Sequence, residues 1–248
     1  MRHWRIWLVP AIAALAFAGI WMLDANRAVF AALNALGPAT GDWLWANITV
    51  VGDTVVAFAL CLPLWRRRPD LVWAFLFVAL LGTLWVHGFK PLVDVARPPA
   101  VMGDVHIIGP AYKAGSFPSG HATTAFAIGG LFALGLKFRT TYVILATAAL
   151  IVALSRAVVG VHWPLDILAG AFGGWLAAAA AIAIGRRTFH LGGKPAVQWA
   201  LGVFLAGCAA WLVIGHSKSG YPQADLFQRA IGICCLAAAA ARLKRAAA

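Results

Sequence analysis

Long, nearly uncharged apolar blocks constrain this sequence more than any other feature. A helix needs about 20 mostly apolar residues to cross a bilayer. Hydrophobic residues make up 62% of the 248-residue chain and charged residues only 11%, which is typical neither of a soluble globule nor of a disordered chain. The pattern predicts an all-α, polytopic membrane helix bundle with an uncleaved first span. Eight stretches are candidates: 5–23, 47–65, 71–88, 119–136, 140–157, 164–185, 196–215 and 226–241.

The distribution of charge predicts how the bundle is oriented. The chain has 20 Lys and Arg residues against eight acids, all of them Asp. If the N-terminus is cytoplasmic, 13 of the 20 basic residues and only one of the eight acids fall on the inner side. The net charge of +12 is then a signal of membrane topology. No nucleic-acid motif accompanies it, so we expect the lipid bilayer and no nucleic acid as partner.

The first element with chemical character follows the third stretch. Lys90 ends that stretch, and Arg97 lies seven residues later, directly before Pro98. Seven residues are close to two helical turns, so the two cations would share a face if this segment were helical. The simpler interpretation is a pair of basic residues whose charged ends reach the membrane surface.

The second element, Pro118-Ser119-Gly120-His121, opens the fourth stretch. Ser119 is a candidate helix N-cap, and Gly120 would let a ligand approach the backbone closely. The free N–H groups and the positive end of the helix dipole would face an anion there. His121 could exchange a proton near neutral pH. Ordinary turn and capping chemistry, with a His at the interface, is the alternative.

The third element lies between the fifth and sixth stretches. Pro164 suits the first position of the sixth helix, which places Asp166 in its first turn and His162 just before it. The carboxylate could then hold one imidazole nitrogen while the other acts as nucleophile or base. A capping carboxylate beside an interfacial His is the alternative. That alternative gives no role to Arg156, whose charge is costly at a membrane-buried helix end.

Chain length predicts that the three elements meet. Ser119 and Ser155 are 36 residues apart, about 54 Å of helix and therefore two bilayer crossings. Fixed cations, a helix N-terminus, two His and one Asp at one membrane face predict a phosphate site. The sequence has no cluster of carboxylates for Mg²⁺ or Zn²⁺, so we expect neither a metal nor another cofactor.

The three elements resemble the signature of the type 2 phosphatidic acid phosphatase superfamily, which is related to acid phosphatases and vanadium haloperoxidases. The signature reads Lys-x6-Arg-Pro, Pro-Ser-Gly-His and Ser-Arg-x5-His-x3-Asp, and residues 70–190 match it at every position. The resemblance implies that His162 is the nucleophile, oriented by Asp166, and passes through a phosphohistidine. It also implies that His121 is the general acid. The implied phosphate-binding residues are Lys90, Arg97, Ser119, Gly120 and Arg156.

The resemblance also implies a six-helix core. Residues 1–187 would supply this core with a periplasmic-side active site, and 188–248 would form a C-terminal extension with one or two further spans. The expected activity is hydrolysis of a lipid phosphate or diphosphate at a bacterial inner membrane. Undecaprenyl diphosphate is the first expected substrate, followed by phosphatidic acid and phosphatidylglycerol phosphate.

Other functions stay open. A lipid-linked phosphotransferase would share the covalent step and pass the phosphoryl group to a hydroxyl in place of water. A haloperoxidase is a more remote variant of the same anion site. A non-enzymatic anion transporter would need a polar path across the bilayer, whereas the charges stop near one surface.

Several polar residues fit these expectations less directly. Gln228 and Arg229 interrupt the eighth stretch, and Asp53 lies in the outer half of the second, where an acid is uncommon. His87 and His106 lie near the predicted site but match no signature position.

Overall fold

The structure is a computed structural model that describes residues 4–136, 138–215 and 219–247, and every regular element among them is a helix. Six segments within these ranges are long and apolar enough to cross a membrane, or seven if a bent pair counts as one span. The predicted all-α membrane bundle is therefore confirmed, and the protein is integral to a membrane. The long helices are α1 (Trp4–Met22), α6 (Pro69–Phe89), α8 (Gly120–Gly135), α9 (Arg139–Val158), α10 (Pro164–Arg187), α12 (Pro195–Ile214) and α13 (Asp225–Ala247).

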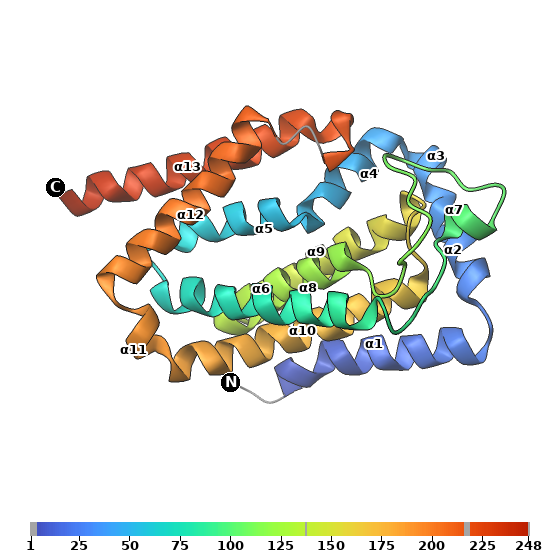
Figure 1. Ribbon diagram of the computed structural model, residues 1–248, viewed down its shortest axis with the longest axis horizontal. Coiled ribbons are helices and arrows are strands. Elements are labelled where there is room, and N and C mark those ends of the chain that lie inside the picture. Colours follow the sequence, from blue (N-terminus) through green and yellow to red (C-terminus); the bar gives the residue numbers. More distant parts are fainter. Residues whose placement is uncertain (1–3, 137, 216–218, 248) are drawn as a thin grey trace.

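Shorter helices connect and cover the bundle. Helices α2, α3 and α7 lie at one end of it together with the loops around α7, and α11 lies at the other end (Figure 1). Helix α1 begins, and α13 ends, away from the end that carries α7. The short helices are α2 (Asn26–Asn34), α3 (Leu36–Thr40), α4 (Asp42–Thr49), α5 (Thr54–Cys61), α7 (Pro98–Val101) and α11 (Phe189–Gly192), with single turns at Val50–Gly52, Leu62–Leu64 and Pro222–Ala224.

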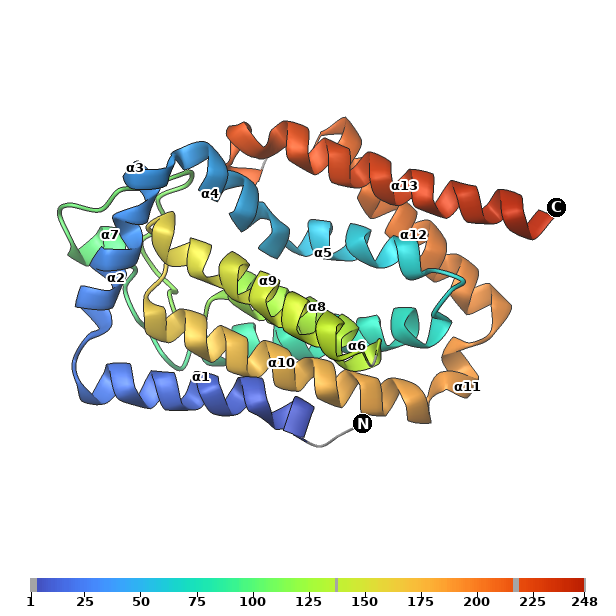
Figure 2. The ribbon, with the colours of Figure 1, turned by 180° about the vertical axis from the view of Figure 1, so that it is seen from behind.

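Helices α8 and α10 pack against each other at the centre of the bundle. Helices α6 and α9 flank α8, α1 lies along α10, and α5 packs with α12 and α13 on the opposite side (Figures 1 and 2). Gly174 of α10 shows how closely the central pair approaches, because a Cβ atom there would lie 2.3 Å from the carbonyl oxygen of Thr123. Small residues allow such backbone contact between helices in membranes. This packing fixes the first turns of α8 and α10 relative to each other.

The second predicted span, 47–65, is not one continuous helix. The segments Asp42–Gly52 and Thr54–Leu64 meet at an angle of 66°. Asp53 has extended backbone geometry at the break, and its Oδ1 accepts hydrogen bonds from the N–H groups of Val55 (2.7 Å) and Val56 (3.4 Å). An acid at this depth is explained by capping, because it satisfies N–H groups that α5 leaves free.

The eighth predicted stretch forms a 23-residue helix, α13, in spite of its polar residues. Gln228 is buried and donates from Nε2 to Ser219 Oγ at 3.1 Å. Arg229 pairs through Nε with Asp225 (2.9 Å) and donates from Nη1 to the Val213 carbonyl (3.1 Å). These contacts give partners to the amide nitrogen of Gln228 and to the guanidinium of Arg229, and they tie the start of α13 to the end of α12.

Replacing Asp53 tests the capping interpretation. We expect Asp53→Ala to lower the free energy of unfolding by about 1 kcal/mol, because two N–H groups at the start of α5 lose their acceptor. Asp53→Asn keeps a side-chain oxygen at the same place and is the matched control. Reversible unfolding in detergent micelles, followed by circular dichroism, measures both. Equal losses in the two variants would show that the charge matters and the cap does not.

Candidate active site

Four helix ends meet where the three sequence elements were expected to converge. Lys90 follows α6, Ser119 precedes α8, Arg156 lies in the last turn of α9, and Asp166 lies in the first turn of α10. The backbone N–H of Ser119 donates to the carbonyl oxygen of Asp166 at 3.0 Å, which joins the starts of α8 and α10 directly. Residues far apart in the sequence thus share one end of the bundle.

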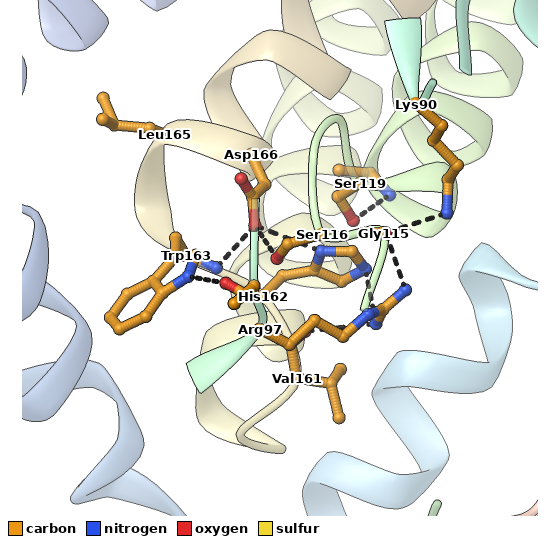
Figure 3. Close-up of polar contacts among 12 residues, drawn as sticks. Lys90, Arg97, Gly115, Ser116, Ser119, Val161, His162, Trp163, Leu165 and Asp166 are labelled. Atoms are coloured by element: carbon orange, nitrogen blue, oxygen red, sulfur yellow. Dashed lines mark hydrogen bonds and ion pairs between the residues drawn. The ribbon is translucent and has the colours of Figure 1, made fainter. Parts of the chain in front are cut away.

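The carboxylate of Asp166 is the centre of a buried hydrogen-bond network (Figure 3). Its Oδ2 accepts from the Ser116 hydroxyl and from the backbone N–H of Trp163 (2.9 Å), and it lies 3.3 Å from Nδ1 of His162. His162 and Asp166 are only 3% and 2% exposed. The network assigns the ring proton to Nδ1, so Nε2 keeps its lone pair. One imidazole nitrogen of His162 thus faces the Asp166 carboxylate, as the spacing of the two residues predicted.

Arg97 approaches the other side of the His162 ring. Its Nη1 lies 3.2 Å from Nε2 of His162 and also donates to the carbonyl of Val161 at 3.2 Å. The remaining guanidinium nitrogens donate to the carbonyls of Ala114 (Nε, 2.9 Å) and Gly115 (Nη2, 3.2 Å). Arg97 therefore links the loop before α8 to the loop before α10.

Lys90 and Arg97 lie close together, but not because they share the face of a helix. Helix α6 ends at Phe89, and turns and loop follow up to Pro98, so the two cations do not share a helical face. Lys90 Nζ instead donates to the carbonyl of Gly115 at 3.1 Å, an oxygen that Arg97 also contacts. Two prolines, Pro91 and Pro98, disfavour a continuous helix here. The loop before α8 therefore gathers both cations.

Arg156 is buried and is held from two further segments. Its Nη1 donates to the hydroxyl oxygens of Thr49 (2.6 Å) and Tyr221 (3.0 Å), and only 2% of the residue is exposed. Its Nε is buried and has no hydrogen-bond partner among the residues that the structure describes. A buried guanidinium with a spare donor is suited to an anion that brings its own oxygens.

The start of α8 completes the group of predicted residues. Ser119 is the N-cap, as expected, and its Oγ accepts from the N–H of Ala122 at 3.4 Å. Gly120 and His121 occupy the first turn, and His121 lies within electrostatic range of Arg156 and His162. The structure thus brings all eight predicted site residues to one end of the bundle.

Positive charge dominates the site. Burial lowers the pKa of His162 well below its usual 6.5, and the charges of Arg97 and Arg156 lower it further. Burial and the neighbouring Arg97 likewise lower the pKa of Lys90. The imidazole of His162 is therefore neutral at neutral pH. The cations repel one another, and a phosphate among them would relieve that repulsion.

A cavity of about 340 Å³ opens from His121 into the bundle. Its walls come from α5, α6 and α8, and side chains such as Phe58, Val78 and Ala79 make it largely apolar. His87, which matches no signature position, lines the same cavity. The site therefore combines a polar end for an anion with an apolar extension along the helices.

Sequence reasoning missed three residues that contact the site. Ser116 bonds to Asp166, while Thr49 and Tyr221 bond to Arg156. Ser116 could have been noticed from its place just before the second element, whereas nothing local marks the other two. His106 lies instead in a pair with Asp42, Nε2 to Oδ1 at 2.7 Å. Across the described ranges, no group of three His, Cys, Asp or Glu side chains could hold a metal ion.

Comparison with known proteins finds a family that matches the part of the chain that carries the predicted site residues. The family model described as the PAP2 superfamily matches residues 71–189, a range that contains Lys90, His121 and His162. Residues 71–189 of this chain are therefore similar to the PAP2 superfamily. The match ends before α12 and α13, so those two helices lie outside the part that defines the family.

Individual relatives of this chain are named as phosphatases. A lipid A 1-phosphatase from Rhizobium etli is 41% identical over 73 residues, which span 29% of this chain and 30% of the Rhizobium protein. An undecaprenyl-diphosphatase from Sulfolobus acidocaldarius is 28% identical over 189 residues, 71% of this chain and 89% of that protein. The crystal structure of LpxE from Aquifex aeolicus superposes with a TM-score of 0.59 at 27% identity and covers 64% of this chain and 94% of its own.

Proposed function

We propose that this protein is a metal-independent lipid phosphatase of the PAP2 superfamily that acts through a phosphohistidine on His162. The observation that carries the proposal is the position of the His162 ring. Nδ1 faces the Asp166 carboxylate, and Nε2 faces the guanidinium of Arg97. A neutral nucleophile is thereby oriented by a carboxylate and directed toward the cations that would hold the phosphate.

The reaction then proceeds in two halves. In the first, Nε2 of His162 attacks phosphorus, a P–N bond forms, and the P–O bond to the lipid breaks as His121 protonates the departing oxygen. In the second, water attacks phosphorus, His121 accepts the water proton, and the P–N bond breaks to release phosphate. Lys90, Arg97 and Arg156 stabilise the charge on the transferring group throughout.

The backbone at the start of α8 would also stabilise the negative charge of the phosphate. N–H groups near Ser119 and Gly120 lie at the positive end of the helix dipole, which favours an anion. Asp166 would stabilise the positive charge that develops on His162 when the P–N bond forms.

The apolar cavity supports a lipid as the substrate, because a phosphate at the cations would leave the tail beside α5, α6 and α8. Undecaprenyl diphosphate is our first candidate, supported by the relative from Sulfolobus, which matches 71% of this chain. The Rhizobium match favours lipid A 1-phosphate as the second candidate. Phosphatidic acid and phosphatidylglycerol phosphate share the same chemistry and follow.

We also propose that the protein lies in a bacterial inner membrane with its N-terminus in the cytoplasm and the site facing the periplasm. The excess of basic residues on the inner side supports this orientation. So does the start of α1, which lies away from the end that carries the site (Figure 1).

Replacing each of the two histidines should affect activity in a different way, depending on the leaving group of the substrate. His162→Ala should abolish phosphate release from every substrate, since no nucleophile remains. His121→Ala should slow lipid phosphates by about 10²–10⁴-fold but slow p-nitrophenyl phosphate much less, because a weakly basic leaving group needs no proton. Phosphate release by purified protein in EDTA measures both. Activity retained in His162→Ala would contradict the covalent mechanism.

The same assay separates hydrolysis from transfer. With ³²P-labelled lipid phosphate, a phosphatase releases the label as free phosphate. Label that moves to the hydroxyl of a second lipid would instead identify a phosphotransferase. Flux of phosphate across liposomes without any bond cleavage would favour a transporter.

The lowered pKa of His162 predicts the acid limb of the pH profile. The neutral nucleophile is lost only as pH falls through this lowered value, so kcat/KM should stay high at pH 6.5 and decline well below it. The pH profile should be measured with a lipid monophosphate and with a lipid diphosphate. An acid limb that appears with both substrates reflects a group of the enzyme and not of the substrate. A common limb at or above pH 6.5 would mean that His162 is not held neutral.

Narrowing the cavity tests the position of the lipid tail. Ala79 lines the cavity on α6, whereas its neighbour Leu80 is 54% exposed on the outside of the bundle. Ala79→Trp should raise KM for long-chain lipid phosphates by about tenfold and leave p-nitrophenyl phosphate little changed, because only the tail site is filled. Leu80→Trp is the matched control. Equal effects of Ala79→Trp on both substrates would place the tail elsewhere.

A further inference from the structure

The two C-terminal helices contribute a side chain to the phosphate-binding end of the molecule. Tyr221 lies in the connection between α12 and α13, beyond the residues 71–189 that match the family. It is 3% exposed, and its hydroxyl oxygen accepts from Nη1 of Arg156 at 3.0 Å. The contact joins residues that are 65 positions apart.

Tyr221 and Thr49 together occupy one nitrogen of the guanidinium. Nη1 carries two N–H groups, and the two hydroxyl oxygens lie at 2.6 Å (Thr49) and 3.0 Å (Tyr221). Nε, which has no partner among the described residues, stays available to a ligand. Arg156 is therefore fixed at one edge and keeps a buried, unused N–H donor at another, as a preorganised anion donor would.

The ring of Tyr221 is locked in place by the loop that precedes α8. It belongs to a small apolar cluster with Val50, Ile108 and Val161. Gly109 has a φ of +84°, and a Cβ atom there would lie 2.5 Å from Cε1 of Tyr221. Only glycine fits this position, because it tolerates both the positive φ and the close ring.

Described residues near Tyr221 are held by contacts with the two helices. Arg229 bonds to Asp225 of its own helix and to the Val213 carbonyl of α12. Gln228 bonds to Ser219, two residues before Tyr221. The hydroxyl is thus presented by an anchored hairpin.

We propose that Tyr221 is a positioning residue for Arg156, and that α12 and α13 thereby complete the phosphate site of this protein. The proposal rests on the proposed phosphatase function. Arg side chains lose considerable rotamer freedom on binding, and a side chain that is already oriented loses less. Because the oriented guanidinium matters most when charge is redistributed over the oxygens of the transferring phosphoryl group, Tyr221 affects the transition state more than the bound phosphate.

The test uses Tyr221→Phe, which keeps the ring and its packing and removes only the hydroxyl. The inhibition constant of orthovanadate, a mimic of the transferring phosphoryl group, should rise about tenfold, since one hydrogen bond to a charged group is lost. The inhibition constant of inorganic phosphate should change much less. With a lipid phosphate as substrate, kcat should fall by a larger factor than KM rises. Tyr142→Phe is the matched control. Tyr142 is also 3% exposed and loses a hydrogen bond, to the carbonyl of Arg5, but it lies at the opposite end of α9.

A double-mutant cycle separates positioning from general stability. In an Arg156→Met background, Tyr221→Phe should change orthovanadate binding by less than about twofold, because the group that it positions is gone. Binding is read there as the rise in unfolding temperature with added orthovanadate, which needs no activity.

The outcomes distinguish the two proposals. If Tyr221→Phe leaves the orthovanadate constant within twofold of wild type, or weakens it equally in the Arg156→Met background, the positioning role is wrong and the phosphatase function stands. If wild-type protein neither hydrolyses lipid phosphates nor binds orthovanadate, both proposals are overturned.

Discussion

The buried carboxylate of Asp166 is the constraint on which the rest of the site depends. A carboxylate with 2% exposure is costly unless it is fully hydrogen-bonded. Its Oδ2 accepts hydrogen bonds from the Ser116 hydroxyl and the Trp163 N–H, and it faces Nδ1 of His162. Its backbone carbonyl accepts from the N–H of Ser119. Satisfying the side chain and the backbone carbonyl of this one residue therefore aligns the loop before α8, the loop before α10 and the first turns of both helices.

The site keeps its positive charge because its arginines bind neutral groups. Arg97 donates to backbone carbonyls and to an imidazole nitrogen, and Arg156 donates to two hydroxyl oxygens. These acceptors orient the guanidinium groups without cancelling their charge. A phosphate among them would meet oriented donors at full charge, and such donors are strongest in a site that excludes water.

Segments on both sides of the range that matches the family contribute to the site. Residues 71–189 match the PAP2 superfamily and contain the predicted nucleophile and general acid. Thr49 reaches Arg156 from the N-terminal side of this range, and Tyr221 reaches it from the C-terminal side. The segments outside the matched range therefore act on the same arginine from two directions.

Local features of this protein could be predicted from the sequence. Hydropathy identified the long helices, since bilayer thickness sets their length. The N-cap at Ser119 and the placement of Pro164 and Asp166 followed from rules that span a few residues. The break in the second span at Asp53 was not predicted, because hydropathy averaged over an apolar stretch does not reveal a single capping residue.

Only the tertiary structure decided which groups hold the cations. Lys90 finds its carbonyl partner 25 residues away, and Arg156 finds its two hydroxyl partners 107 and 65 residues away. These contacts arise from helix packing and loop closure, and no short pattern encodes them. The sequence by itself determined which chemical groups are present, and it predicted that they come together at one end of the bundle. Three-dimensional packing decided their orientation, because a hydrogen bond depends on positions in space, whatever the separation along the chain.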